Sequence, residues 1–258
     1  MTQSSSWLLS RAVNILLVSD LHYSLRHLDW VVEQAPDFDA VVLAGDHLDI
    51  SSNVPLESQI VVIQTYVKAI ASVTTAVVCS GNHDLTARNE HSEKSAPWLQ
   101  QAEPTGAIVD WETLDLDDVR ITVCPWWDGP ETRADVAEQL RRDAETRPRV
   151  WIWVYHYPPD DTAVSWTGRN YIGDPDLNRW IEQHKPDLVL TGHIHDSPFR
   201  EGGSWLARLG DTCVINAGRM PGPMPAHAII DSASGTAEWW SPYGRASEQL
   251  WPATTGAQ

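Results

Sequence analysis

The sequence is poor in cysteine, and its few cysteines form no recognisable framework. The 258 residues include Cys79, Cys124 and Cys213. An odd number at wide spacing excludes a disulfide scaffold and fits no zinc-binding pattern. Each cysteine lies in or beside an apolar, β-branched run, so we expect buried free thiols in a reducing compartment.

Positive charge is also scarce. The chain has 18 Lys and Arg against 35 Asp and Glu, a net charge of -17. Proteins that grip nucleic acid by its backbone need Lys and Arg to neutralise the phosphates, so a nucleic-acid partner is disfavoured. A small phosphate ester remains compatible with this charge, because a bound metal ion dominates the field around it.

Long apolar runs are missing as well. The apolar segment 14–18 (NILLV) is far shorter than the roughly 20 residues that span a bilayer. The first residues show no basic region before this segment and no small-residue cleavage site, so no signal peptide is predicted. We therefore expect a cytoplasmic protein with no membrane partner.

Short apolar strands alternate with amphipathic helices along the chain, a pattern typical of α/β proteins. Strands are predicted at 14–20, 39–46, 75–84, 119–127, 150–159 and 187–195. Helices are predicted at 25–35, 55–73, 131–147 and 174–184. A last series of strands, at 211–218, 227–232 and 236–240, is typical of an antiparallel sheet edge.

No repeat, low-complexity tract or linker divides the chain. We predict a single domain over residues 1–258 with its core at about 13–242. The ends, roughly 1–12 and 243–258, are predicted to be loosely held.

Metal-binding residue types follow five of the predicted strands. They are Asp20 and His22, Asp46 and Asp49, Asn82 and His83, His156, and His193 and His195. The carboxyl ends of strands in an open α/β sheet converge on the ligand crevice. A lone Asp at a strand end is usually a turn or cap residue, but five such groups at successive strand ends indicate a metal centre. Imidazole and carboxylate together suit Mn, Fe or Zn.

The motifs DLH (20–22), GDHLD (45–49), GNHD (81–84), YHYPP (155–159) and GHIH (192–195) occur in this order. Together they resemble the calcineurin-like metallophosphoesterase superfamily, and they span most of the chain. The resemblance implies a four-layer αββα sandwich of two mixed β-sheets flanked by helices. It also implies a metal-dependent hydrolase of phosphate esters with two divalent ions.

The resemblance implies a role for each matching residue. Seven match the family's metal ligands: Asp20, His22 and His195 for the first ion, Asn82, His156 and His193 for the second, and Asp46 as the bridge. His83 matches the catalytic imidazole, and Asp49 matches the carboxylate that orients it.

These roles are chemically consistent. Two divalent ions carry four positive charges, and Asp20 and Asp46 return two. The remaining charge binds phosphate and acidifies a bridging water. His83 would then protonate the leaving oxygen, a step typically worth about 10²–10⁴-fold.

One departure narrows the expected function. The family's Ser/Thr protein phosphatases place a phosphate-holding Arg after the GD-x-x-D motif, whereas Asp49 is followed by Ile50 and Ser51. The chain is more similar to compact bacterial-type phosphodiesterases, so we predict a phosphodiesterase acting on a small or nucleotide-like substrate. The alternatives are a phosphomonoesterase and a non-catalytic binding scaffold of the same fold.

Substrate contacts are predicted from Asn82 and His83, and from Arg169 in the loop after His156. Trp126 and Trp127 lie at a strand end and are candidates for a crevice wall. Trp151 and Trp153 alternate with aliphatic residues along a strand and are predicted to lie in the core. No motif specifies the substrate, the metal or the oligomeric state.

Overall fold

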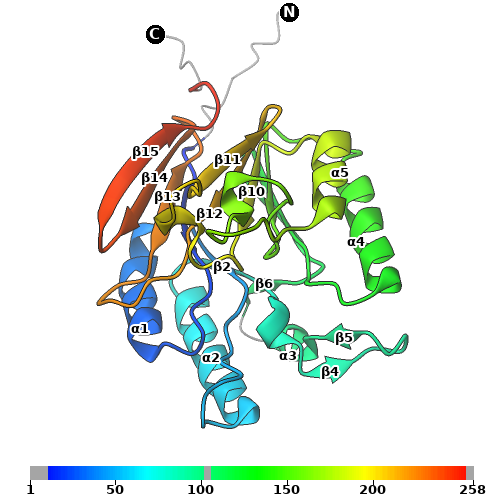
Figure 1. The fold of residues 1–258 in the computed structure, drawn as a ribbon, viewed down its shortest axis with the longest axis vertical. Coiled ribbons are helices and arrows are strands. Elements are labelled where there is room, and N and C mark those ends of the chain that lie inside the picture. The colour runs from blue at the N-terminus through cyan, green and yellow to red at the C-terminus, as the bar shows by residue number, and fades with distance from the viewer. Residues whose placement is uncertain (1–10, 102–105, 254–258) are drawn as a thin grey trace, which may run out of the picture.

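The computed structural model describes residues 11–101 and 106–253, which form two mixed β-sheets flanked by helices (Figure 1). The seven-stranded sheet has the order β15-β14-β13-β1-β2-β3-β6, and the six-stranded sheet has the order β11-β12-β10-β9-β8-β7. A short hairpin, β4-β5, stands apart from both.

In the seven-stranded sheet, β1, β2, β3 and β6 run parallel, while β13, β14 and β15 are added antiparallel at one side. The strands are β1 (Asn14–Val18), β2 (Ala40–Ala44), β3 (Thr75–Cys79), β6 (Ile108–Val109), β13 (His227–Asp231), β14 (Thr236–Ser241) and β15 (Gly244–Gln249).

In the six-stranded sheet, β8, β9, β10 and β12 run parallel, with β7 and β11 antiparallel at the two edges. The strands are β7 (Thr113–Leu116), β8 (Val119–Val123), β9 (Val150–Val154), β10 (Leu188–Thr191), β11 (Leu206–Leu209) and β12 (Thr212–Asn216). The separate hairpin consists of β4 (Ala87–Arg88) and β5 (Lys94–Ser95).

The helices cover the outer faces of the two sheets. They are α1 (Leu25–Gln34), α2 (Leu56–Ala71), α3 (Pro97–Gln100), α4 (Pro130–Asp143) and α5 (Pro175–His184). Figure 1 shows α1 and α2 on one side of the molecule and α4 and α5 on the other. The proline at the first position of α4 and α5 supplies a preset φ where no backbone donor is needed.

Strand alternation explains the layers, because successive side chains point to opposite faces of a sheet. Ile15 and Leu17 of β1 pack between the two sheets, whereas Leu16 and Val18 pack against the helical layer of α1 and α2. The central strands β1, β2 and β9 are buried on both faces and therefore have almost no polar residues. The predicted four-layer αββα sandwich is confirmed.

Strand β9 shows the same alternation in the other sheet. Ile152 faces the inter-sheet core, while Trp151 and Trp153 face α4 and α5 and are fully buried, as predicted. The three cysteines are also buried and free, as predicted.

Two features differ from the sequence prediction. The strand series expected to form one antiparallel edge is divided: β12 pairs parallel with β10 in the six-stranded sheet, and only β13 and β14 join the other sheet. The cause is the loop 217–226, which carries the chain from one sheet to the other and has no signature in strand periodicity.

The second difference is β15, which forms the outer strand of the seven-stranded sheet within a segment predicted to be loosely held. The sequence of β15 is polar and shows no apolar strand pattern, because an edge strand exposes most of its side chains. The remaining parts of that prediction at residues 1–10 and 254–258 lie outside the described residues. Within the described ranges, no helix is long and apolar enough to cross a membrane.

Candidate metal centre

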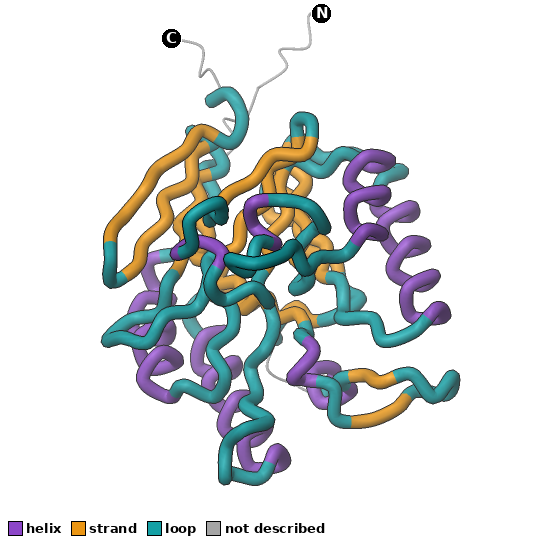
Figure 2. Tube along the Cα trace, in the orientation of Figure 1, coloured by secondary structure: helices purple, strands orange, loops and turns teal. Residues whose placement is uncertain are grey.

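The carboxyl ends of five parallel strands meet at one edge of the two sheets. Asp20 follows β1, Asp46 follows β2, Asn82 follows β3, His156 follows β9 and His193 follows β10. Figure 2 shows loops crossing the centre of the view between the two pairs of helices. These short loops place side chains from both sheets within reach of one another.

The ligand atoms form two groups that share one carboxylate. Asp20, His22, Asp46 and His195 each offer an atom within 4.8 Å of the others, and Asp46, His156 and His193 meet the same limit. Asp46 therefore lies between two candidate sites, the position in which the sequence predicts a bridging ligand. Each group combines imidazole and carboxylate donors, a set that suits Mn, Fe or Zn.

In the first group the ring nitrogens and the carboxylates converge closely. The Nε2 atoms of His22 and His195 lie 3.0 Å apart. His195 Nε2 is 3.2 Å from Asp20 Oδ1, and His22 Nε2 is 3.7 Å from Asp46 Oδ2. All four side chains thus point toward one small volume.

In the second group, His156 directs one ring nitrogen toward the carboxylates. Its Nδ1 donates a hydrogen bond to the Ala44 carbonyl at 2.6 Å, which orients the ring and leaves Nε2 to face Asp46. The buried Nε2 lies 3.4 Å from Asp46 Oδ2 and has no hydrogen-bond partner. A buried polar atom without a partner calls for an explanation, and a metal ion at this position provides one.

His193 and Asn82 complete this second group. His193 Nδ1 lies 2.9 Å from Asn82 Oδ1, so the two donor atoms face each other across the loops that follow β10 and β3. The backbone N–H of His193 donates to Asp20 Oδ1 at 3.0 Å, which links the two groups. Second contacts of this kind hold metal ligands in one orientation.

The electrostatics keep the ligands in metal-binding protonation states. Burial lowers the pKa of His22 to about 4, and burial together with the charge of His156 lowers the pKa of His193 to about 4. Burial alone would raise the pKa of Asp46, but the charge of His156, the backbone hydrogen bond from His83 and the charge of His83 together hold that pKa below its usual range. Neutral imidazoles and an ionised carboxylate result near neutral pH.

His156 behaves differently because it faces both carboxylates. Burial by itself would lower its pKa, but the charges of Asp46 and Asp20 raise the pKa to about 9. In the metal-free protein, a proton on His156 therefore compensates the negative charges of Asp46 and Asp20. A divalent cation would satisfy the same charges and take the place of that proton.

The loops hold several ligands in an unusual backbone conformation. Asp20, His22, Asp46 and His193 have φ values of 55°, 43°, 54° and 69°. This left-handed region costs a non-glycine residue on the order of 1–3 kcal/mol. Backbone hydrogen bonds hold it in place: the N–H of His22 donates to the Asp46 carbonyl at 2.9 Å.

Two glycines allow the loops to approach this closely. Gly45 has a φ of 83°, and a Cβ there would lie 2.3 Å from His156 Nδ1. A Cβ on Gly81 would lie 2.2 Å from Asp46 Oδ1. The backbone of Gly81 is extended, so the close approach of Asp46, and not turn geometry, requires glycine there.

His83 lies beside the ligand groups. Its Nε2 is 3.9 Å from Asp46 Oδ2, and its ring centroid is 4.6 Å from that of His22. Its side chain is 22% exposed, so it reaches both the ligands and the solvent. Its Nδ1 is buried without a hydrogen-bond partner.

Asp49 does not contact His83 in the described structure. Its carboxylate accepts a hydrogen bond from the Ser51 N–H at 2.8 Å, and its own N–H donates to Gln59. The predicted orienting contact is therefore absent between these two residues, because the Asp49 side chain caps its own turn.

A different carboxylate organises this part of the site. The buried Asp84 accepts hydrogen bonds from the backbone N–H groups of Gly81, His47 and Leu48. It ties the turn that contains Asn82 to the loop that contains Asp46. In the GNHD motif, bonding to local backbone is the role that the sequence favours for Asp84 over a direct one.

Arg169 is not placed among the ligands. It lies in an exposed turn where the Thr167 hydroxyl accepts a hydrogen bond from its N–H at 3.4 Å. The described structure shows no contact between Arg169 and the ligand groups. Its assignment to substrate remains a prediction.

Arg219 is a cation at the site that the sequence did not reveal. Its backbone N–H donates to the His195 carbonyl at 3.0 Å, and its charge contributes to the lowered pKa of His22. The residue is exposed, and no acidic side chain pairs with it among the described residues. It follows β12, outside every motif, so no pattern marked it.

Two aromatic rings form a wall beside the second group. Trp126 and Tyr157 stack with centroids 4.9 Å apart, and their centroids lie 5.1 Å and 4.9 Å from that of His193. The prediction of a crevice wall therefore fits Trp126. Trp127 instead donates a hydrogen bond to Asp174.

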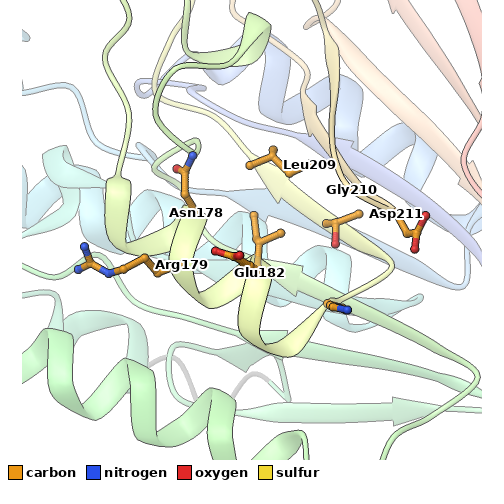
Figure 3. A pocket seen from close by; sticks show the side chains of 9 residues that line it. Asn178, Arg179, Glu182, Leu209, Gly210 and Asp211 are labelled. Atoms are coloured by element: carbon orange, nitrogen blue, oxygen red, sulfur yellow. The ribbon is translucent and has the colours of Figure 1, made fainter.

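A separate pocket lies away from the ligand groups. It has a volume of about 550 Å³ and lies between α5 and the β11–β12 turn (Figure 3). Thr212, which lines it, is the first residue of β12, and Lys185 precedes β10. This pocket is therefore at the amino ends of the strands, at the opposite edge from the ligand groups.

Comparison with known proteins agrees with this geometry. A family model described as calcineurin-like phosphoesterase matches residues 13–197. No curated protein matches the sequence significantly.

Solved structures share the fold at low identity. The protein TT1561 of Thermus thermophilus is 16% identical, with a TM-score of 0.57 over 93% of this chain and 100% of that chain. The purple acid phosphatase PPD1 from yellow lupin seeds is 12% identical, with a TM-score of 0.57 over 93% of this chain and 52% of that chain. At these identities the likeness concerns the fold.

Proposed function

Since the chain belongs to the calcineurin-like phosphoesterase family of metal-dependent hydrolases, we propose that it is a dinuclear phosphodiesterase acting on a small, nucleotide-like ester. The observation that carries the proposal is the pair of ligand groups that share Asp46. Two ions held by one carboxylate lie close enough to act on a single phosphate.

The proposed ligands follow the two groups. One ion is held by Asp20, His22 and His195, the other by Asn82, His156 and His193, and Asp46 bridges them. The bare Nε2 of His156 and the neutral state of His22 support this assignment. When bound, the two ions supply positive charge for the phosphate oxygens and acidify a water for attack on phosphorus.

His83 is the proposed general acid. Its Nε2 lies beside Asp46 yet remains open to solvent, so it can hold a proton where the leaving oxygen departs. Asp84 supports it indirectly by fixing the turn on which it lies. An orienting role for Asp49 has no contact to support it.

The surroundings favour a diester over a monoester. A monoester carries more negative charge than a diester, yet the position after Asp49 is the exposed Ile50. Arg219 is the cation beside His195, and we assign it to a non-bridging phosphate oxygen. The stacked rings of Trp126 and Tyr157 offer a surface for the second substituent that only a diester has.

The test compares bis-p-nitrophenyl phosphate with p-nitrophenyl phosphate after reconstitution with Mn, Fe or Zn. We expect faster turnover of the diester and a metal content of about two equivalents. Faster turnover of the monoester would select the phosphomonoesterase alternative. A plateau at one equivalent with full activity would contradict the dinuclear centre, and no turnover with any metal would select the binding scaffold.

A further inference from the structure

The β4–β5 hairpin places two positive charges directly opposite each other. Arg88 and Lys94 are cross-strand partners, and both side chains are exposed. Like charges in this arrangement are destabilising. Among the described residues neither forms an ion pair, and the guanidinium of Arg88 donates to the Ser92 carbonyl.

Both cations line one pocket of about 330 Å³. Ser95 and Gln100 add polar side chains to its wall, whereas the Thr132 hydroxyl already donates to Glu93 and the Asn89 amide to Thr132. These are the residue types that bind the oxygens of an anion. The protein has a net charge of -17. This pocket differs from that general character, because it contains two cations without acidic partners.

The carboxylates of Glu93 and Asp128, near the hairpin, already accept hydrogen bonds from backbone N–H groups. Glu93 accepts hydrogen bonds from the N–H groups of Glu131 and Thr132 and thereby caps α4. Asp128 accepts the backbone N–H of Lys94 at 3.0 Å. Neither carboxylate forms an ion pair with the Lys94 ammonium within the described structure.

The remaining acid of the pocket is Asp110. It is buried and accepts a hydrogen bond from the Ser80 N–H at 2.8 Å. Burial raises the pKa of its carboxyl to about 7. Below that pH this wall of the pocket carries little negative charge to oppose an anion.

One indole ring separates this pocket from the metal centre. Trp126 lines the pocket, and its ring centroid lies 5.1 Å from that of His193 and 5.8 Å from that of His156. Its backbone N–H donates to the Ser80 hydroxyl at 2.9 Å. Ser80 also lines the pocket and lies two residues before Asn82, a proposed ligand.

We propose that this pocket binds a second anionic group, a phosphate or a carboxylate, on the part of the substrate that does not react. This inference rests on the proposed function, because it assumes that the reacting phosphate lies at the metal centre. Arg88 and Lys94 hold the second group, and Trp126 packs against the portion of the substrate between the two anions. The substrate class is therefore an ester with two separated anionic groups. Figure 1 shows the hairpin beside α3, at the end of the molecule below α4.

Two esters that differ by one phosphate test the proposal. Thymidine 5′-p-nitrophenyl phosphate has only the reacting phosphate, and thymidine 3′-phosphate 5′-p-nitrophenyl phosphate adds a second. The metal-loaded enzyme should show a KM about tenfold lower for the bisphosphate, the effect of one added charge-assisted contact. Lys94→Gln and Arg88→Gln should each reduce this preference.

Lys68→Gln is the matched control, because it removes one exposed positive charge on α2 and Lys68 does not line the pocket. It should leave the preference between the two esters unchanged. An equal loss of preference in Lys68→Gln would reduce the effect to net charge and overturn the subsite. Equal KM values for the two esters in the wild-type enzyme would also overturn it.

A binding measurement separates this inference from the proposed reaction. Thymidine 3′-monophosphate is titrated calorimetrically into chelator-treated protein, which cannot hydrolyse it. Binding that weakens in Lys94→Gln supports the subsite even if neither ester is hydrolysed, in which case the proposed diesterase activity fails alone. Turnover of both esters, with binding that is indifferent to Lys94, keeps the diesterase and overturns the subsite.

Discussion

The two edges of the sheets, at the amino ends and at the carboxyl ends of the parallel strands, differ in the chemistry of their side chains. At the amino edge the loops around β10 and β12 enclose a pocket of about 550 Å³ lined by residues such as Asn178, Glu182 and Asp211 (Figure 3). At the carboxyl edge Asp20 and Asp46 are almost completely buried among imidazoles. The amino edge offers a pocket lined by ordinary polar and apolar groups, and the concentrated chemistry lies at the other edge.

The difference teaches that a cavity is not by itself a sign of chemistry in this fold. The residues at the amino edge are exposed polar groups with ordinary partners, as shown by the ion pair of Arg179 with Asp176. At the carboxyl edge, buried ring nitrogens of His83 and His156 have no hydrogen-bond partner. The pKa of His156 is also shifted, and several of the candidate ligands have a left-handed backbone conformation. Strained backbone and perturbed pKa values are usually concentrated at functional sites.

The largest expected effect follows from the shared carboxylate. Asp46→Asn removes a negative charge from both ligand groups, so both should lose affinity for metal. We expect hydrolysis to fall by about 10³-fold or more, with lower metal content. Asp211→Asn at the amino edge is the matched control and should change neither. Near-normal turnover of Asp46→Asn would show that Asp46 is only a turn residue.

The next effect separates catalysis from metal binding. His83→Ala should keep both ions but slow esters with poor leaving groups by about 10²–10⁴-fold. Nitrophenyl esters should suffer less, because that oxygen leaves without a full proton. The measurement is kcat for an alkyl and a nitrophenyl ester, with metal content determined in parallel.

Asp49→Asn is the companion variant. The Asp49 carboxylate is bound to Ser51 and does not touch His83, so we expect only a small change in rate. A leaving-group dependence like that of His83→Ala would restore the orienting role that the resemblance implies. If His83→Ala slows both esters equally and loses an ion, His83 is a ligand and not the acid.

Metal removal should destabilise the carboxyl edge more than the amino edge. A ligand present at 100–1,000 times its Kd stabilises the folded state by about 3–4 kcal/mol, so chelation should lower the melting temperature. Hydrogen exchange should accelerate at the loops of Asp20 and Asp46 and remain unchanged near Gly210. Identical melting curves with and without chelator would argue against tight binding.

The buried Asp110 should make the free energy of unfolding depend on pH. Burial raises its folded pKa to about 7, well above the ordinary value of an aspartate. The folded state therefore holds the proton more tightly, and its stabilising contribution is lost as pH rises through 7. Asp110→Asn should remove this slope, a change of about 3 kcal/mol in the free energy of unfolding between pH 5 and pH 8. Urea unfolding at both pH values measures it, and parallel slopes for wild type and variant would refute it.

The smallest expected effect concerns the arginine that the motifs did not mark. Arg219→Ala should raise KM for a diester about tenfold, the loss of one charge-assisted contact, with metal content unchanged. Arg179→Ala at the amino edge removes the same charge and should leave KM unaltered. If both variants behave alike, Arg219 contributes only to the general field.

Local patterns predicted an α/β protein with polar residues at its strand ends, and the resemblance to the family implied the four layers. Runs of Val, Ile and Leu marked β1, β2 and β9, and the short motifs after them named the donors that the fold brings together. Periodicity is a property of one strand, however, and carries no information about its neighbour. The pairing of β12 with β10 and the edge strand β15 therefore had to come from the structure.

The contacts between side chains were harder to foresee. The resemblance assigned an orienting role to Asp49, but that carboxylate bonds its own turn, and Asp84 instead ties the two loops together. Arg219 and the pocket of the β4–β5 hairpin depend on loops that meet only in three dimensions. Such loops have no spacing rule from which their contacts can be predicted.

Strand β15 has a consequence for how copies of this protein meet in solution. It pairs with the outer edge of β14 (Figure 1), the strand that contains Trp239 and Trp240, and the Arg245 guanidinium lies 5.3 Å from the centroid of the Trp240 ring. An uncovered strand edge rich in aromatics is a template for pairing with another chain. The polar, charged sequence of β15 replaces that edge with one that discourages pairing. The segment that looked least structured in the sequence is thus the sheet's protection against self-association.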